Sequence, residues 1–116
     1  MELTRRTFIV QIEGQEVRGV VRRASGAERV AYLAAQDAAD KSDHIAYMET
    51  LEGMRRQEVT PNLLELPGVT VDGVGLADAG PNFWEYLPAE VYQAAVSCRL
   101  GLSADVGNSE SSRGDT

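Results

Sequence analysis

Two short segments of alternating apolar and polar residues near the start of the chain constrain its fold most strongly. Residues 7–12 (TFIVQI) and 17–22 (VRGVVR) flank the tetrapeptide Glu13-Gly14-Gln15-Glu16. The dipeptide Gly14-Gln15 suits a two-residue type II′ turn, because glycine tolerates the positive φ that this turn needs at its first central position. We therefore predict an antiparallel hairpin over residues 7–22.

The predicted register separates the side chains of the hairpin onto two faces. The expected cross-strand pairs on one face are Ile12 with Val17, Val10 with Gly19, and Phe8 with Val21. The opposite face carries Gln11 with Arg18 and Thr7 with Arg22. A slip of one residue would move every side chain to the other face. We expect the apolar face to cover the core.

Two helices are expected directly after the hairpin. The segment Ser25-Gly26-Ala27-Glu28 matches the S-x-x-E capping box and predicts a helix over residues 26–39. Ser42 or Asp43 can cap a second helix over residues 43–57. We expect these helices to pack as an antiparallel pair over the apolar face of the hairpin.

The middle of the chain is rich in glycine and proline. Residues 69–71 and 74–76 flank Asp72-Gly73, which predicts either a small second hairpin with a type I′ turn or an irregular loop. The glycines in residues 66–80 match neither a phosphate-binding loop nor a dinucleotide fingerprint.

A third helical region is expected over residues 82–101. Asn82 is its expected cap, Pro88 either kinks it or begins a new helix, and Gly101 ends it. Residues 103–116 contain one large apolar residue and are expected to be disordered. The prediction is an α+β fold: one globular domain over residues 1–102, with the hairpin packed on three to four helices, and a flexible tail.

Charge and composition limit the class of partner. The chain has 116 residues and a net charge of −7, and its acidic body disfavours a nucleic-acid partner. No apolar run approaches the roughly 20 residues of a membrane span, and the N-terminal residues lack the features of a signal peptide. One cysteine cannot form an internal disulfide, which favours an intracellular location.

Six arginines lie within the first 29 residues and leave that region with an excess of positive charge. Their two readings are a solvated hairpin surface and a contact for an acidic protein partner. Arg18 and Arg22 are the candidate partner-binding residues. The set is Arg5, Arg6, Arg18, Arg22, Arg23 and Arg29.

The densest aromatic cluster lies where the third helical region begins. One reading is a lid on the core; the other is an anchor for a partner, a role in which tryptophan and tyrosine are favoured. The cluster comprises Phe83, Trp84, Tyr86 and Leu87.

Few residues carry reactive chemistry. His44 with Asp37 and Asp40 falls short of a recognised metal motif, and these residues are ordinary in a junction between helices. Cys98 on an apolar stripe is more typical of a small buried residue than of a nucleophile. Arg113-Gly114-Asp115 matches an adhesion tripeptide that chance explains. We expect no catalytic, cofactor-binding or metal site.

Two segments carry a resemblance to a known family. Ser25 to Leu33 (SGAERVAYL) stands after a hairpin, and Leu87-Pro88-Ala89-Glu90 opens the helix that precedes a polar tail. In this order the chain resembles the tail assembly chaperones of long-tailed, lambda-like bacteriophages. The resemblance covers residues 7–57 and 82–116, and the glycine-rich segment 66–80 has no counterpart in that family.

The resemblance implies a non-enzymatic protein that coats the phage tape-measure protein in the host cytoplasm and recruits tail-tube subunits. It also implies self-association, and in the family a ribosomal frameshift adds a second domain. Two alternatives remain open on the residues alone. One is a structural virion protein of the tail or head–tail connector, and the other is a small metal-binding or regulatory domain built on His44.

Overall fold

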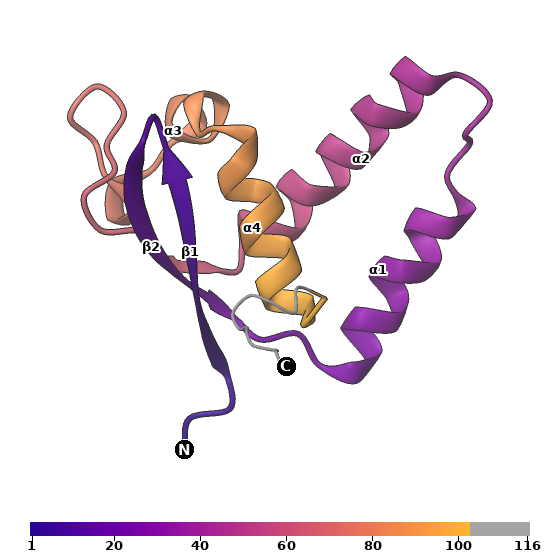
Figure 1. The fold of residues 1–116 in the computed structure, drawn as a ribbon, viewed down its shortest axis with the longest axis horizontal. Coiled ribbons are helices and arrows are strands. Elements are labelled where there is room, and N and C mark those ends of the chain that lie inside the picture. Colours follow the sequence, from indigo (N-terminus) through magenta and orange to yellow (C-terminus); the bar gives the residue numbers. More distant parts are fainter. Residues whose placement is uncertain (103–116) are drawn as a thin grey trace.

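The computed structural model describes residues 1–102 and combines a three-stranded antiparallel sheet with four α-helices in this part of the chain (Figure 1). The predicted α+β class, with an N-terminal hairpin and a small set of helices, is confirmed. The tail predicted over residues 103–116 lies outside the described residues. The elements are β1 (Arg5–Ile12), β2 (Gln15–Arg22), α1 (Gly26–Ala38), α2 (His44–Val59), β3 (Leu63–Glu65), the 3-10 turn η1 (Leu76–Asp78), α3 (Pro81–Tyr86) and α4 (Ala89–Leu100).

The hairpin forms, but the predicted register is wrong by two residues. Glu13 and Gly14 have φ values of 51° and 80°, so they form a type I′ turn in place of the type II′ turn expected on Gly14-Gln15. A shift of two residues keeps every side chain on its predicted face, because side chains alternate with a period of two. The observed pairs are Ile12 with Gln15, Val10 with Val17, and Phe8 with Gly19.

Gly19 has a packing role in this register. The ring of Phe8 lies on the backbone of Gly19 so closely that a Cβ at residue 19 would overlap it. Both residues are buried. The glycine therefore opens the space in which the largest side chain of β1 meets the sheet.

The first two helices begin as the sequence predicts. The hydroxyl of Ser25 accepts a hydrogen bond from the Glu28 amide, and the Glu28 carboxylate accepts one from the Ser25 amide, which completes the capping box of α1. The carboxylate of Asp43 accepts bonds from the first amides of α2.

The helices α1 and α2 do not cover the apolar face of the hairpin, contrary to the prediction, and they also make few contacts with each other, so the packed pair expected from the sequence is wrong. That face packs against α4, which also contacts α2 and so lies between the hairpin and the α1–α2 pair (Figure 1). The reason is the amount of apolar surface. Six side chains of α4 are buried, whereas α1 buries only Tyr32.

The central segment contains a strand that the sequence reading missed. Residues Leu63–Glu65 form β3 and pair with β2, so β1 remains at one edge of the sheet. Asp72 and Gly73 adopt the predicted type I′ turn, with φ values of 52° and 79°. Only one isolated bridge, between Val71 and Val74, accompanies it, which agrees with the irregular-loop alternative.

The third helical region is divided in two. Pro81 occupies the first turn of α3 and Gly80 is its N-cap, so the expected cap at Asn82 is wrong. The side-chain Nδ2 of Asn82 instead donates to the Asp72 carboxylate at 2.9 Å. Pro88 precedes α4 and begins a new helix. Gly101 ends α4 with a φ of 70°, as predicted.

Candidate functional site

A groove of about 880 Å³ lies between β1 and α4. Its apolar wall comes from Phe8 and Val10 of β1 and Ala94 of α4. Arg18 of β2 lines it on the side of the sheet, and Glu90 lines it on the side of the helix. The groove is therefore apolar inside and carries opposite charges on its two sides. The sequence reading did not predict it, since it depends on α4 lying beside β1.

The start of α4 after Pro88 and the contact between Cys98 and β1 shape this groove. Pro88 sets the start of α4, and residues spaced three and four apart then line the groove along one face of the helix: Glu90, Gln93, Ala94, Ser97 and Cys98. The thiol of Cys98 lies 3.5 Å from the carbonyl oxygen of Thr7 on β1. Burial raises the pKa of the Cys98 thiol, and nearby Arg6 opposes this rise. A neutral thiol at this position is a poor nucleophile.

The two candidate arginines have different surroundings. Arg22 donates from Nε and Nη2 to the side-chain oxygen of Asn62, at 3.1 and 2.7 Å, and its Nη2 lies 3.8 Å from a Glu28 carboxylate oxygen. Arg18 is exposed and has neither an ion pair nor a side-chain hydrogen bond among residues 1–102. Arg18 is thus available to a partner, whereas Arg22 supports the fold.

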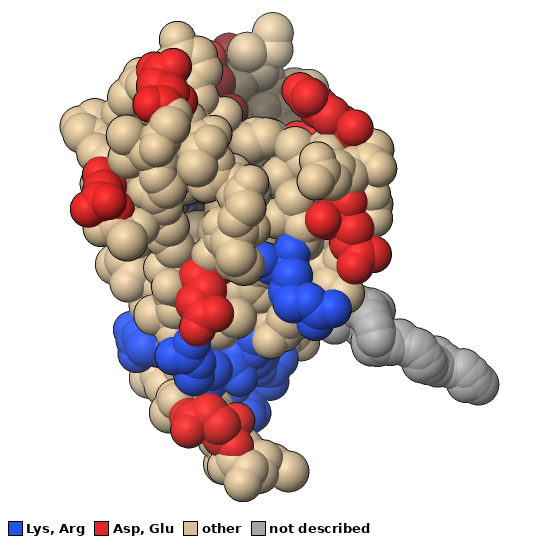
Figure 2. All heavy atoms as spheres, turned by 90° about the vertical axis from the view of Figure 1, so that its left-hand side faces the viewer, with Lys and Arg blue, Asp and Glu red and all other residues tan. Residues whose placement is uncertain are grey.

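Of the other hairpin arginines, Arg5 and Arg6 make contacts within the fold, whereas Arg23 is exposed. Arg5 forms an ion pair with Glu65 of β3, and Arg6 donates to the Cys98 carbonyl oxygen at 3.3 Å. Figure 2 shows lysine and arginine side chains gathered on the hairpin side of the molecule, with acidic side chains around them. The solvated surface expected for all six arginines therefore holds for only part of the set.

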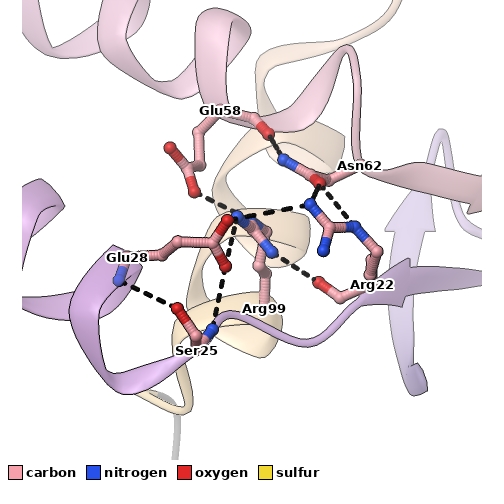
Figure 3. Close-up of polar contacts among 6 residues, drawn as sticks. All are labelled: Arg22, Ser25, Glu28, Glu58, Asn62 and Arg99. Carbon is pink, nitrogen blue, oxygen red and sulfur yellow. Dashed lines mark hydrogen bonds and ion pairs between the residues drawn. The ribbon is translucent and has the colours of Figure 1, made fainter. Parts of the chain in front are cut away.

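A buried polar network centred on Arg99 was not predicted from the sequence (Figure 3). Arg99 is 2% exposed, and its Nε donates to Glu58 at 2.7 Å. Its Nη1 donates to the Arg22 carbonyl oxygen at 2.8 Å, and its Nη2 lies 3.4 Å from Glu28. Every nitrogen of this guanidinium thus has a partner, so the network joins α4 to α1, α2 and β2.

The same network forms the floor of a second, smaller cleft between α1 and α2, of about 520 Å³. Its walls include Ala31 and Tyr32 from α1 and Met54 from α2. Two arginines and two glutamates balance one another at its floor, so the cleft offers no free charge there. Its polar groups therefore support the fold and do not point to a bound ion.

The aromatic cluster is split by the structure. Phe83 and Leu87 are buried, Trp84 is half-buried, and Tyr86 is 68% exposed. The Tyr92 hydroxyl donates to the Trp84 carbonyl oxygen at 2.7 Å and ties this turn to α4. The lid reading holds for Phe83 and Leu87, and only Tyr86 and the open part of Trp84 remain as candidates for a partner anchor.

The segment that comprises α1, the loop after it and the first part of α2, here called the arm (residues 26–50), exposes several large apolar side chains. Val30 is 66% exposed, Ile45 is 72% exposed and Met48 is 44% exposed. These residues lie on helices whose N-termini are capped by Ser25 and Asp43, so the exposure does not reflect a lack of local structure. The arm thus presents apolar helix surface without a partner inside residues 1–102.

The candidate reactive residues lie on separate elements. His44 begins α2 at the far end of the arm, whereas Cys98 lies on α4 beside β1. Among residues 1–102 no group of three potential metal ligands is assembled, and Asp40 instead accepts a hydrogen bond from the Ser42 amide at 2.9 Å. Arg113-Gly114-Asp115 lies outside the described residues.

Within residues 1–102, none of the helices combines the length and apolar character that crossing a bilayer requires. Comparisons of the chain with protein-family models, with curated proteins and with solved structures found no match.

Proposed function

We propose that this chain is a non-enzymatic binding protein that keeps an amphipathic helical partner in solution, as tail assembly chaperones of long-tailed phages do for the tape-measure protein. The observation that carries the proposal is the arm, where Val30, Ile45 and Met48 are exposed on ordered helices. Exposed apolar surface of this kind favours a protein partner, and helices bind one another through such faces.

The charge of the chain supports the same proposal. A net charge of −7 would keep a complex with an apolar partner soluble through mutual repulsion. The resemblance extends the proposal to recruitment of tail-tube subunits in the host cytoplasm, with the chain acting as a homo-oligomer. Arg18, Tyr86 and the open part of Trp84 are the residues best placed to contact such additional partners.

Co-expression with a fragment of a tape-measure protein tests the proposal. The wild-type chain should increase the soluble fraction of the fragment severalfold, and a variant with Val30→Ser, Ile45→Ser and Met48→Ser should lose this effect. Leu64→Ser with Val74→Ser is the matched control, because both residues are exposed apolar residues outside the arm. A fragment that stays insoluble with and without the chain would refute the proposal.

Two further measurements separate the alternatives. Mass spectrometry that finds the chain in purified phage particles would favour a structural virion protein. A metal-dependent rise in melting temperature that is lost in His44→Ala would favour a metal-binding domain. The first result would contradict a role confined to assembly, and the second would show a metal site that the proposal does not include.

A further inference from the structure

The free edge of β1 has main-chain groups directed away from the sheet. The turn at Glu13-Gly14 makes Ile12 and Gln15 the first hydrogen-bonded pair, so even-numbered residues of β1 bond to β2. The bond from the Arg23 amide to the Thr4 carbonyl oxygen, at 2.8 Å, continues this alternation. The N–H and C=O groups of odd-numbered residues therefore point outward.

Two of these outward residues are open. The Thr7 carbonyl oxygen faces the Cys98 thiol, which confirms the outward direction at that residue. Within residues 1–102, no loop or side chain bonds to the main chain of Ile9 or Gln11. An exposed edge of this kind is a template for an additional strand.

The groove lies beside this open edge. Phe8 and Val10 line it from the core face of β1, and Ala94 lines it from α4. A strand added to the edge would alternate its side chains between the groove and the outer face of the sheet. The residue opposite Ile9 would lie on the outer face, and its two neighbours would point into the groove.

The charge of Arg18 determines which side chain of the added strand is favoured on the outer face of the sheet. Arg18 is the cross-strand partner of Ile9, lines the groove, and has no ion pair in the described part of the chain. An acidic side chain opposite Ile9 would lie within reach of this guanidinium. Glu90 lies on the helix side of the groove and disfavours acids there.

The other edge of the same sheet already holds a segment of this chemistry. The residues in and after β3 read Leu63-Leu64-Glu65-Leu66, with Leu63 and Leu66 buried in the core. Glu65 remains exposed and pairs with Arg5 of the hairpin. The sheet thus accepts an apolar segment with one acid facing a hairpin arginine.

From these observations we propose that the open edge of β1 binds an extended segment of a partner protein with the pattern apolar–acidic–apolar. The acid pairs with Arg18, the two apolar side chains enter the groove, and the main chain bonds to Ile9 and Gln11. A second copy of this chain pairing through β1 does not fit, because Phe8-Ile9-Val10 has an isoleucine where the acid is required. The inference does not depend on the arm, since it concerns the edge of the sheet and an extended partner; Arg18 is the one residue that it shares with the proposed function.

Fluorescence anisotropy with short labelled peptides and the full chain tests this proposal. A peptide with glutamate between two valines should bind about tenfold more tightly than its counterpart with lysine, the factor expected for a charge-assisted hydrogen bond. Arg18→Gln should remove this preference, whereas Arg23→Gln should keep it, because Arg23 is also exposed but does not line the groove. Equal binding of the two peptides to the wild-type chain would overturn the proposal.

The strand-addition geometry is tested separately from the charge. Methylation of the glutamate amide of the peptide removes a main-chain donor without any change in the protein, and it should reduce affinity at least tenfold. Ile9→Pro removes the matching donor at the edge but no bond to β2, so this variant should also bind the peptide more weakly. Binding should also protect the Ile9 and Gln11 amides from hydrogen exchange. Full binding of the methylated peptide, or protection only on the arm, would refute strand addition.

Discussion

The helices α1 and α4 have almost equal lengths, 13 and 12 residues, but opposite relations to the rest of the protein. α1 has a complete capping box and buries one side chain. α4 starts after Pro88 with no side-chain cap, yet six of its residues are buried. In this pair, the helix with the stronger side-chain cap has the fewer buried residues.

This difference separates a core helix from a helix available for binding. α4 contacts the hairpin and α2, so its loss would remove the centre of the fold. α1 is held through Tyr32, its cap, the Glu28 ion pairs and the hydrogen bond from Arg29 Nε to the Leu100 carbonyl oxygen, and with one buried side chain it can open or shift at lower free energy than α4. An arm of this kind can adjust to a partner while the sheet and α4 remain in place.

The largest expected effect comes from the network that anchors α4. Arg99→Ala should lower the free energy of unfolding by about 3–5 kcal/mol, because it leaves Glu58 and the Arg22 carbonyl without their buried donor. Urea unfolding followed by circular dichroism measures this change. Arg23→Ala is the control and should change stability by less than about 0.5 kcal/mol. A similar small change for Arg99→Ala would show that the network is dispensable.

A pair of valines compares the two helices with the same substitution. Val91 of α4 is 0% exposed, whereas Val30 of α1 is 66% exposed. Val91→Ala should cost about 2 kcal/mol through the cavity that it leaves. Val30→Ala should raise the free energy of unfolding slightly, by about 0.3 kcal/mol, since alanine has the higher helix propensity. Equal losses in urea unfolding would mean that the arm is part of the core.

Two glycines extend the comparison to the sheet and to α2. Gly19→Ala should cost about 1–3 kcal/mol, because the added Cβ overlaps the Phe8 ring. Gly53→Ala in α2 meets open space and should add about 0.5–1 kcal/mol by favouring the helix. Thermal unfolding of both variants measures the change in melting temperature, which should fall for Gly19→Ala and rise for Gly53→Ala. A stabilising Gly19→Ala would show that Phe8 can leave its position without cost.

The smallest expected effect is the pH dependence of α1. The hydrogen bond from the Ser25 amide is the largest cause that lowers the pKa of Glu28, and the nearby Arg99 and Arg22 lower it further. A lowered folded pKa means that the contribution is present above the unfolded value, about 4.3, and is lost as pH falls through the folded value.

Amide exchange in α1 should therefore accelerate as the pH is lowered below about 4, relative to the exchange of α4 at the same pH. Glu28→Gln should reduce this dependence, because glutamine keeps the capping hydrogen bond without the charge. An unchanged pH dependence in Glu28→Gln would assign the effect to other carboxylates.

Much of the local structure was predictable because its causes are close in sequence. The capping box at Ser25, the cap at Asp43 and the end of α4 at Gly101 each depend on residues within one turn. The faces of the hairpin were also predictable, since alternation alone assigns them. The register was not, because it depended on whether Glu13 would adopt a left-handed conformation.

The candidate site was less predictable, because it depends on residues far apart in the chain. Arg18 and Arg22 are equivalent in a sequence pattern, but only Arg22 meets Asn62, which is 40 residues away. The aromatic cluster could not be divided between lid and anchor before the path of α3 was known. The groove requires α4 beside β1, and no local signal places it there.

The sequence alone thus determined where the hairpin, α1 and α2 occur and which side of the hairpin is apolar, because short-range hydrogen bonding and side-chain alternation act within a few residues. The tertiary structure decided which helix covers the sheet, which arginines are free, and which edge stays open. These outcomes depend on competition for buried apolar area and on charge pairs such as Arg99 with Glu58, 41 residues apart, which exist only once the chain has folded.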